Sequence, residues 1–163
     1  MATFEEMVIP NHEAMVTFGQ EFARRLRAGD VLLLHGDLGA GKTTLTQGIA
    51  AGLGVSESIQ SPTFALVAEH EGVDGSGLPI RVYHLDLYRL ENEEELEGIG
   101  YELYVAPVDG ISVIEWPERA GEWLPDRFWL IRIGNRESGG RVVRVERHEF
   151  GVNGIDESGL RIK

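Results

Sequence analysis

The chain has 163 residues, a length that suits one domain with its own hydrophobic core. Its formal net charge of −12, from 15 Lys and Arg against 27 Asp and Glu, disfavours unaided binding to nucleic acids and acidic membranes. It contains no cysteine, which excludes a disulfide framework, a thiolate metal site and a cysteine nucleophile.

The sequence lacks the signals of membrane insertion and export. No stretch approaches the ~20 apolar residues of a membrane span, and residues 1–6 have neither the basic nor the apolar region of a signal peptide. We therefore expect a soluble, cytoplasmic protein with no membrane partner. Residues 1–163 are expected to form a single domain, with a loosely held tail from about residue 151.

The first third of the chain predicts a strand, a helix, a second strand and a second helix. Residues 3–9 suit a short strand, and Asn11 can cap a helix in which apolar residues recur every three or four positions until Gly29. The apolar run 31–34 predicts a buried strand over residues 31–35, and residues 43–54 predict the helix after it. Strand, loop and helix together predict the first half of a βαβ unit.

The loop between this second strand and second helix carries the clearest chemical motif. Residues 36–43 read GDLGAGKT and match the pattern G-x-x-x-x-G-K-[ST]. The glycines let several backbone N–H groups point at one anion, and the helix that follows adds the positive end of its dipole. Lys42 would contact the β- and γ-phosphates and the Thr43 hydroxyl would bind Mg²⁺, so the loop predicts a nucleotide-phosphate site.

The middle of the chain predicts a hairpin of two antiparallel strands. Ser61 precedes a predicted strand over residues 64–69. It either belongs to a simple strand entrance, since Pro62 disfavours a helical Ser61, or it senses the γ-phosphate or its metal. Residues 71–79 predict the turn that leads into a second strand over residues 81–86.

The second half of the chain predicts one short helix and three more strands. The acidic run 91–97 suits the start of a solvated helix, with partner docking as the alternative. Residues 111–115 predict a buried strand, and residues 128–133 and 141–147 predict two strands around the turn 135–140.

Two carboxylates qualify as the acid that phosphate-loop chemistry needs beside the loop. Asp86 and Glu115 each end an apolar strand. One is expected to hold Mg²⁺ and the other to orient the attacking water or read the γ-phosphate; each could instead be an exposed strand-end acid. His84 shares a strand face with Asp86 and is either a general base or a packing residue.

The sequence says less about which nucleobase is bound than about phosphate binding. The Asn-Lys-x-Asp signature that reads guanine is absent from the sequence, which favours ATP over GTP. Arg141, which follows the Gly139-Gly140 turn, is either a late contact to the nucleotide or an exposed strand arginine. The tryptophans Trp116, Trp123 and Trp129 are expected to be packing groups rather than a platform for bases.

Four segments, taken in order, resemble the motifs of the TsaE (YjeE) family. They read GDLGAGKTT at 36–44, SPTF at 61–64, HLDLYRL at 84–90 and IEWP at 114–117. The resemblance extends over about residues 10–147, and its last two motifs are far more specific than the phosphate loop alone. Members of this family are bacterial P-loop ATPases required for making N6-threonylcarbamoyladenosine (t6A) on tRNA.

The resemblance implies an α/β P-loop NTPase fold, in which a mostly parallel central sheet with antiparallel additions is flanked by helices. It implies Mg²⁺ ligation by Thr43 and Glu115, and a role of Asp86 in hydrolysis beside that of Lys42. The nucleotide-binding residues that it implies are Gly39, Ala40, Gly41, Lys42, Thr43, Thr44, Asp86 and Arg141.

The implied activity is Mg²⁺-dependent ATP hydrolysis, slow in the isolated chain, in a complex with TsaB and TsaD. In that complex TsaD transfers the threonylcarbamoyl group and TsaE hydrolyses ATP to allow repeated turnover. The negative net charge agrees with contact to tRNA only through the complex. The alternatives are a small-molecule kinase, although residues 43–115 contain no segment that resembles a lid, and a sensor that binds ATP without hydrolysing it.

Overall fold

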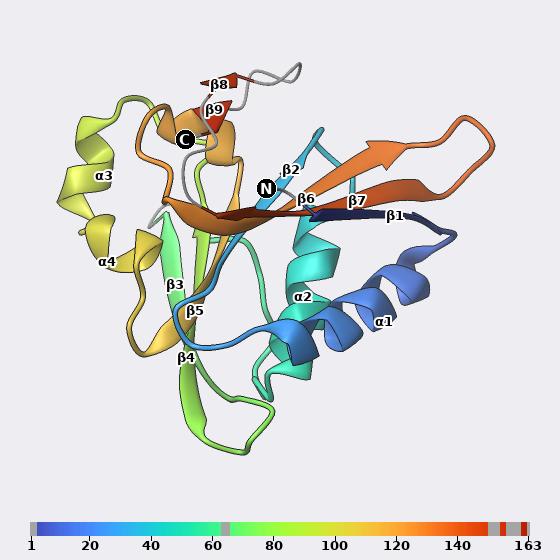
Figure 1. The fold of residues 1–163 in the computed structure, drawn as a ribbon, viewed down its shortest axis with the longest axis horizontal. Helices are drawn as coiled ribbons and strands as arrows, with labels where there is room; N and C mark the ends of the chain where they lie inside the picture. Colours follow the sequence, from blue (N-terminus) through green and yellow to red (C-terminus); the bar gives the residue numbers. More distant parts are fainter. Residues whose placement is uncertain (1–2, 63–65, 150–153, 156–160, 163) are drawn as a thin grey trace.

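A seven-stranded sheet forms the centre of the molecule, with strand order β1-β7-β6-β2-β5-β4-β3 (Figure 1). The structure is a computed structural model, which describes residues 3–62, 66–149, 154–155 and 161–162. Its elements are β1 (Thr3–Ile9), α1 (His12–Phe22), η1 (Ala23–Arg25), β2 (Val31–Gly36), α2 (Lys42–Gly52), β3 (Val67–Val73), β4 (Pro79–Asp86), α3 (Glu94–Gly98), α4 (Glu102–Val105), β5 (Gly110–Glu115), η2 (Pro117–Ala120), β6 (Arg127–Asn135), β7 (Arg141–Glu149), β8 (Gly154–Ile155) and β9 (Arg161–Ile162).

The sheet is parallel in the middle and antiparallel at both sides. Strands β6, β2, β5 and β4 are parallel neighbours, whereas β3 joins β4, and β7 and β1 extend from β6, in antiparallel pairs. The predicted α/β fold with a mostly parallel central sheet is therefore confirmed. In the register, Glu115 pairs with Leu34 on one side and with Asp86 on the other, so the carboxyl ends of three strands meet at one edge.

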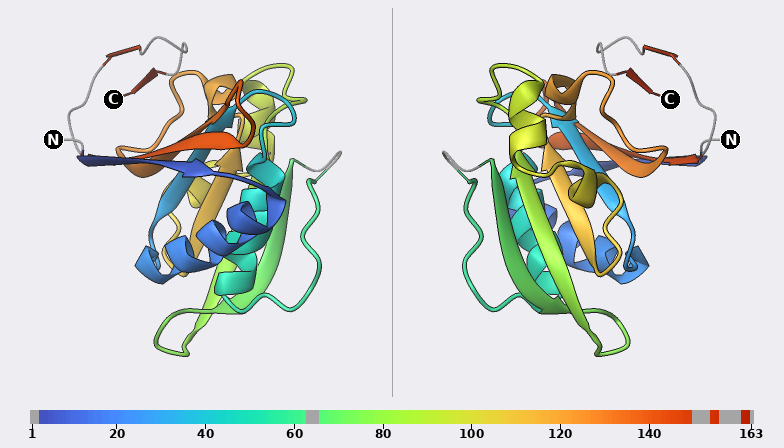
Figure 2. Two further views of the ribbon diagram at one scale, coloured as in Figure 1. Left: turned by 90° about the vertical axis from the view of Figure 1, so that its right-hand side faces the viewer. Right: turned by 90° about the vertical axis from the view of Figure 1, so that its left-hand side faces the viewer.

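Helices cover both faces of the sheet (Figure 2). Strand β2 is buried on both sides: Leu32 and Leu34 pack in the core under α1 and α2, whereas Val31 and Leu33 pack in the core under α3 and α4. This double burial explains why the strand is a continuous apolar run rather than an alternating pattern.

Helices α1 and α2 approach each other closely at glycines. A Cβ atom at Gly48 would lie 2.4 Å from the carbonyl oxygen of Val16, and one at Gly19 would lie 2.8 Å from the backbone N of Ile49. Only glycine therefore allows this approach. The contact fixes α2, whose first residues carry the phosphate-loop lysine and threonine, against α1.

Several predicted elements differ from the structure in their bounds. The turn predicted over residues 71–79 is shorter, because β3 runs to Val73 and β4 begins at Pro79. Helix α1 is capped by the Asn11 side chain as predicted, but it ends at Phe22 and continues only as a short 3-10 turn, η1, before Gly29. The strand predicted over residues 64–69 begins at Val67 instead, because Leu66 has a φ of 62°, a left-handed conformation that extended strands do not contain. Residues 63–65 lie outside the described part of the chain.

The tail predicted from about residue 151 lies largely outside the described residues, apart from β8 and β9, which pair antiparallel. Of the helices in the described ranges, none combines the length and apolar character needed to cross a membrane.

Candidate nucleotide-binding site

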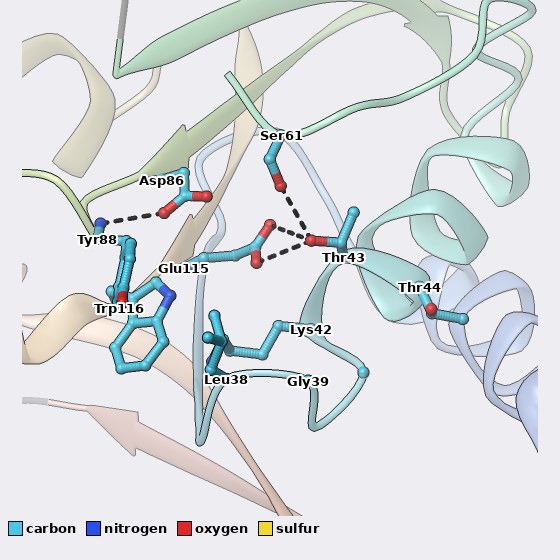
Figure 3. Close-up of a pocket in the computed structure, with 11 residues that line it drawn as sticks. Leu38, Gly39, Lys42, Thr43, Thr44, Ser61, Asp86, Tyr88, Glu115 and Trp116 are labelled. Carbon is cyan, nitrogen blue, oxygen red and sulfur yellow. Dashed lines mark hydrogen bonds between the residues drawn. The ribbon is translucent and has the colours of Figure 1, made fainter. Parts of the chain in front are cut away.

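The loop between β2 and α2 forms one wall of a cavity at the carboxyl edge of the parallel strands. Gly39 and Gly41 adopt φ angles of 80° and 116°, which favour glycine, and Gly41 caps the N-terminus of α2. The cavity measures about 260 Å³. Its lining residues are Leu38, Gly39, Gly41, Lys42, Thr43, Thr44, Ser61, Asp86, Tyr88, Glu115 and Trp116 (Figure 3).

Lys42 is buried at this wall and its ammonium group is held by the loop itself. The Nζ atom donates to the carbonyl oxygen of Gly36 and to that of Asp37 at 3.1 Å, and it lies 3.7 Å from the ring centroid of Trp116. Burial lowers the pKa of Lys42, and nearby carboxylates, Glu115 first among them, partly oppose this shift. A desolvated cation in this position favours the approach of an anion.

Thr43 and Glu115 meet across the floor of the cavity (Figure 3). The Thr43 hydroxyl oxygen lies 3.2 Å from Oε1 and 3.5 Å from Oε2 of Glu115, whose side chain is almost fully buried. Two neighbouring oxygen ligands of an octahedral Mg²⁺ ion lie about 2.9 Å apart, given bond lengths of 2.0–2.1 Å. The two side chains therefore fit adjacent positions on such an ion after a small adjustment.

Ser61 approaches the same hydroxyl from the loop that follows α2. Its Oγ atom lies 3.0 Å from Oγ1 of Thr43. Of the SPTF segment, Thr63 lies outside the described residues, as does Phe64. Among the residues that are described, no group of three or more acidic or histidine side chains could hold a metal. This is consistent with a magnesium site that takes most of its ligands from phosphate and water.

Asp86 lines the cavity at the end of β4 but faces a different environment from Glu115. Its Oδ1 atom accepts a hydrogen bond from the backbone N–H of Tyr88 at 3.0 Å (Figure 3). Burial raises the pKa of Asp86; the Tyr88 hydrogen bond opposes this shift, and the Glu115 charge adds to it. Both acids line the cavity, but their partners differ: Glu115 contacts the Thr43 hydroxyl, whereas Asp86 accepts from the backbone of Tyr88.

A second cavity of about 230 Å³ lies on the other side of the phosphate loop. It shares Gly39, Gly41 and Thr44 with the first cavity and is also lined by Arg141. Arg141 donates from Nε to the carbonyl oxygen of Ala40 at 2.9 Å and from Nη2 to that of Gly39 at 3.4 Å. The remaining lining residues are Ile9, Asn11, His12, Met15 and Ala40.

Three side chains of the site, those of Trp116, Tyr88 and His84, have contacts that the sequence does not predict. Trp116 packs against the core as predicted, but its indole also covers Lys42, and its ring centroid lies 4.9 Å from that of Tyr88. Both aromatic residues follow closely on the two strand-end acids, a signal that could have placed them beside the cavity. His84, for which the sequence allows either a general base or a packing residue, places its Nε2 atom 2.5 Å from Oε2 of Glu115.

Comparisons with known proteins agree on one family. The family described as "Threonylcarbamoyl adenosine biosynthesis protein TsaE" matches residues 9–143 of this chain. The chain is 37% identical over 150 residues to "tRNA threonylcarbamoyladenosine biosynthesis protein TsaE" of Haemophilus influenzae, covering 89% of this chain and 91% of the relative. It is 44% identical over 143 residues to the Nostoc protein of the same name, covering 86% and 84%.

A solved structure supports the same relationship. The crystal structure of Bacillus subtilis YdiB superposes with a TM-score of 0.68 at 29% sequence identity, covering 91% of this chain and 88% of that chain. The family match covers most of the chain and includes the phosphate loop, both strand-end acids and Arg141. The chain therefore belongs to the TsaE family.

Proposed function

We propose that this chain is the ATP-binding and ATP-hydrolysing component of the machinery that makes t6A on tRNA, acting with TsaB and TsaD. Family membership supports the pathway, since the relatives are named for this biosynthesis. The observation that carries the biochemical part is the convergence of Lys42, Thr43 and Glu115 in one cavity at the N-terminus of α2.

The proposed phosphate contacts come from the loop backbone and one ammonium group. The N–H groups of residues 39–44 would surround the phosphates, as helix N-termini do for anions. Lys42 would exchange its contacts with the Gly36 and Asp37 carbonyls for the β- and γ-phosphates. This exchange costs little, because one set of oxygen acceptors replaces another and the phosphates carry full negative charge.

Thr43 and Glu115 would hold Mg²⁺ as oxygen ligands, since they are already close together in the cavity floor. When bound, Mg²⁺ would neutralise negative charge on the phosphate oxygens. Asp86 would orient the attacking water, because its carboxylate borders the open cavity rather than the Thr43 hydroxyl.

The second cavity offers room for the nucleoside. It adjoins the phosphate cavity through Gly39, Gly41 and Thr44, the side on which the α-phosphate and sugar would leave the loop. Arg141 would contact the nucleotide there, held in place by its two hydrogen bonds to the loop carbonyls. ATP is thus the proposed substrate, consistent with the absence of a guanine-reading signature.

A partner surface beside the site is supported by apolar side chains at the cavity mouth. Leu38 and Tyr88 line the cavity and yet are 72% and 40% exposed. Exposed apolar groups around a polar site are typical of surfaces that another protein covers. Completion of the site by TsaB and TsaD would explain slow hydrolysis by the isolated chain, and tRNA would be reached only through that complex.

The test is to measure phosphate release from ATP and Mg²⁺ by the chain alone and with TsaB and TsaD, together with t6A formed per complex. We expect slow release alone, faster release with the partners, and more than one t6A per complex only when ATP is hydrolysed. Formation of ADP that depends on a small-molecule acceptor would favour a kinase instead. ATP binding without hydrolysis under every condition would leave a nucleotide sensor.

A further inference from the structure

His84, on strand β4, contacts the proposed metal ligand Glu115 directly. The side chain is fully buried, with 0% exposure, and its Nε2 atom lies 2.5 Å from Oε2 of Glu115. A carboxylate can only accept, so Nε2 carries the hydrogen and donates it. Strands β4 and β5 are parallel neighbours in which His84 is paired with Val113 and Asp86 with Glu115, so the histidine reaches the acid diagonally, from one same-face position earlier on β4.

The contact divides the two oxygens of the Glu115 carboxylate between two partners. Oε2 receives the histidine N–H, whereas Oε1 lies 3.2 Å from the Thr43 hydroxyl and is the closer of the two to it. A glutamate side chain has three rotatable bonds, and fixing it costs conformational entropy. The hydrogen bond from His84 offsets part of this cost and holds the carboxylate with Oε1 directed at Thr43.

The remaining surroundings of the ring suggest that this hydrogen bond is its main polar role. The other ring nitrogen of His84, Nδ1, is buried and has no hydrogen-bond partner within the described ranges. A side chain that only fills space in a core is usually apolar, because an unpaired buried nitrogen is unfavourable. The hydrogen bond from Nε2 to Glu115 is the better explanation for a histidine at this position.

We propose that His84 is a positioning residue that orients the Glu115 carboxylate for Mg²⁺, an inference that rests on the proposed function of the site. Partners that hydrogen-bond a metal-binding side chain fix its orientation and raise metal affinity, and their loss typically weakens binding about 10- to 100-fold. His84 would thus act through Glu115 and would not contact ATP or the metal itself.

A pair of amide substitutions separates this role from simple packing. The side-chain nitrogen of glutamine reaches about as far as Nε2 of histidine, whereas that of asparagine reaches only about as far as Nδ1. His84→Gln can therefore keep a donor near Glu115, and His84→Asn cannot. His148→Asn is the matched control: His148 is also buried, and its Nε2 atom lies 3.0 Å from a glutamate, Glu146, outside the site.

The measurement is the affinity for Mn²⁺, used as a magnetic probe for Mg²⁺, determined by electron paramagnetic resonance in the presence of ADP. ADP affinity in EDTA and thermal unfolding are measured for each variant. His84→Asn should weaken Mn²⁺ binding at least about tenfold. His84→Gln should stay within about threefold of the wild type, and His148→Asn should match the wild type in Mn²⁺ affinity even where its stability falls. Metal-free ADP affinity should be unchanged in all three.

The outcomes distinguish the positioning role from the proposed function. Wild-type Mn²⁺ affinity in His84→Asn, or equal weakening in His84→Gln and His84→Asn, overturns the positioning role and leaves the ATPase proposal intact. A wild-type chain that binds neither ADP nor Mn²⁺ overturns the proposed function itself. Loss of metal-free ADP affinity in His84→Asn alone would show general damage to the cavity and would likewise overturn the positioning role.

Discussion

The hydroxyl oxygen of Thr43 lies 3.2 Å from Oε1 of Glu115, although 72 positions separate the two residues in the chain. The parallel pairing of β2 with β5 produces this contact, because it brings the end of one strand beside the start of the phosphate loop. Neither side chain reaches the other through local structure. The contact unites a helix N-terminus that attracts anions with a buried carboxylate that attracts cations, the combination that a metal-bound triphosphate requires.

Replacing Lys42 with alanine should weaken ATP binding by about 10- to 100-fold, which corresponds to the ~1.5–3 kcal/mol of a hydrogen bond to a charged group. Among the described residues that line this cavity, Lys42 is the only lysine or arginine. Isothermal titration calorimetry with ATP measures the loss. Unfolding without nucleotide serves as the control for folding, and unchanged ATP affinity and hydrolysis would refute the role of Lys42.

Exchanging the two acids for their amides should produce different defects. Glu115→Gln should abolish the response to Mg²⁺ and lower hydrolysis by at least about 100-fold, because it removes the charge of the proposed Mg²⁺ ligand beside Thr43. Asp86→Asn should retain binding of ATP with Mg²⁺ but lower hydrolysis by about 10²- to 10⁴-fold, the usual effect of losing a general base. Phosphate release measured against Mg²⁺ concentration separates them. A normal magnesium response in Glu115→Gln would transfer the metal to Asp86.

Tryptophan fluorescence should report nucleotide binding through Trp116. The Lys42 ammonium group lies 3.7 Å from its ring centroid, and the phosphates of ATP should draw that group away from the ring. We expect an emission change on addition of ATP that Trp116→Phe abolishes, while Trp123 and Trp129 still emit. ATP affinity should remain within about fivefold, since phenylalanine keeps an aromatic ring there and losing ~0.5–1 kcal/mol of cation–π attraction changes affinity about two- to fivefold. An unchanged signal in Trp116→Phe would assign the response to another tryptophan.

Gly48→Ala should destabilise the fold by about 1–3 kcal/mol or more. Its added methyl carbon would lie 2.4 Å from the carbonyl oxygen of Val16, so α1 and α2 would have to separate. Urea unfolding gives the free energy. Gly98→Ala is the matched control, because nothing lies within 4 Å of a Cβ at that helix residue, and it should leave stability unchanged or raise it by up to ~1 kcal/mol. Equal stability of Gly48→Ala and the wild type would contradict the close helix contact.

The stability contributed by Glu146 should disappear in acid. Burial acts to raise the pKa of Glu146, but the Arg132 hydrogen bond at 2.7 Å and the His148 contact outweigh it, so its pKa is lowered from the ordinary 4.5. A carboxyl group with a lowered pKa stabilises the fold above its unfolded-state value and loses this contribution as pH falls through the folded-state value. Glu146→Gln should therefore cost about 1–3 kcal/mol at neutral pH.

The check on Glu146 is the difference in unfolding free energy between wild type and Glu146→Gln from about pH 7 to pH 3. It should stay constant down to about the ordinary pKa and shrink below it. Glu149→Gln changes an exposed acid on the same strand and should alter stability by less than ~0.5 kcal/mol throughout. A difference for Glu146→Gln that does not depend on pH would contradict the charge-based explanation.

Much of the fold follows from local chemistry, which the sequence carries in short segments. The apolar run of β2 and the Asn11 cap of α1 were predicted because burial and capping depend on a few neighbouring residues. The start of β3 was predicted too early, because the left-handed conformation of Leu66 depends on surroundings that no local pattern encodes. The predicted helix α1 extends beyond Phe22 because apolar spacing continues to Leu26, but in the structure the helix ends at Phe22 and Leu26 is extended.

The sequence by itself determined that a phosphate loop, two strand-end acids and the motifs of the TsaE family are present, because each is a fixed spacing along the chain. Only the tertiary structure decided that Glu115 contacts Thr43, that Trp116 covers Lys42 and that His84 holds Glu115. These contacts join separate strands and loops. Sheet register and helix packing set them, and both depend on how distant segments bury their apolar faces together rather than on any one segment.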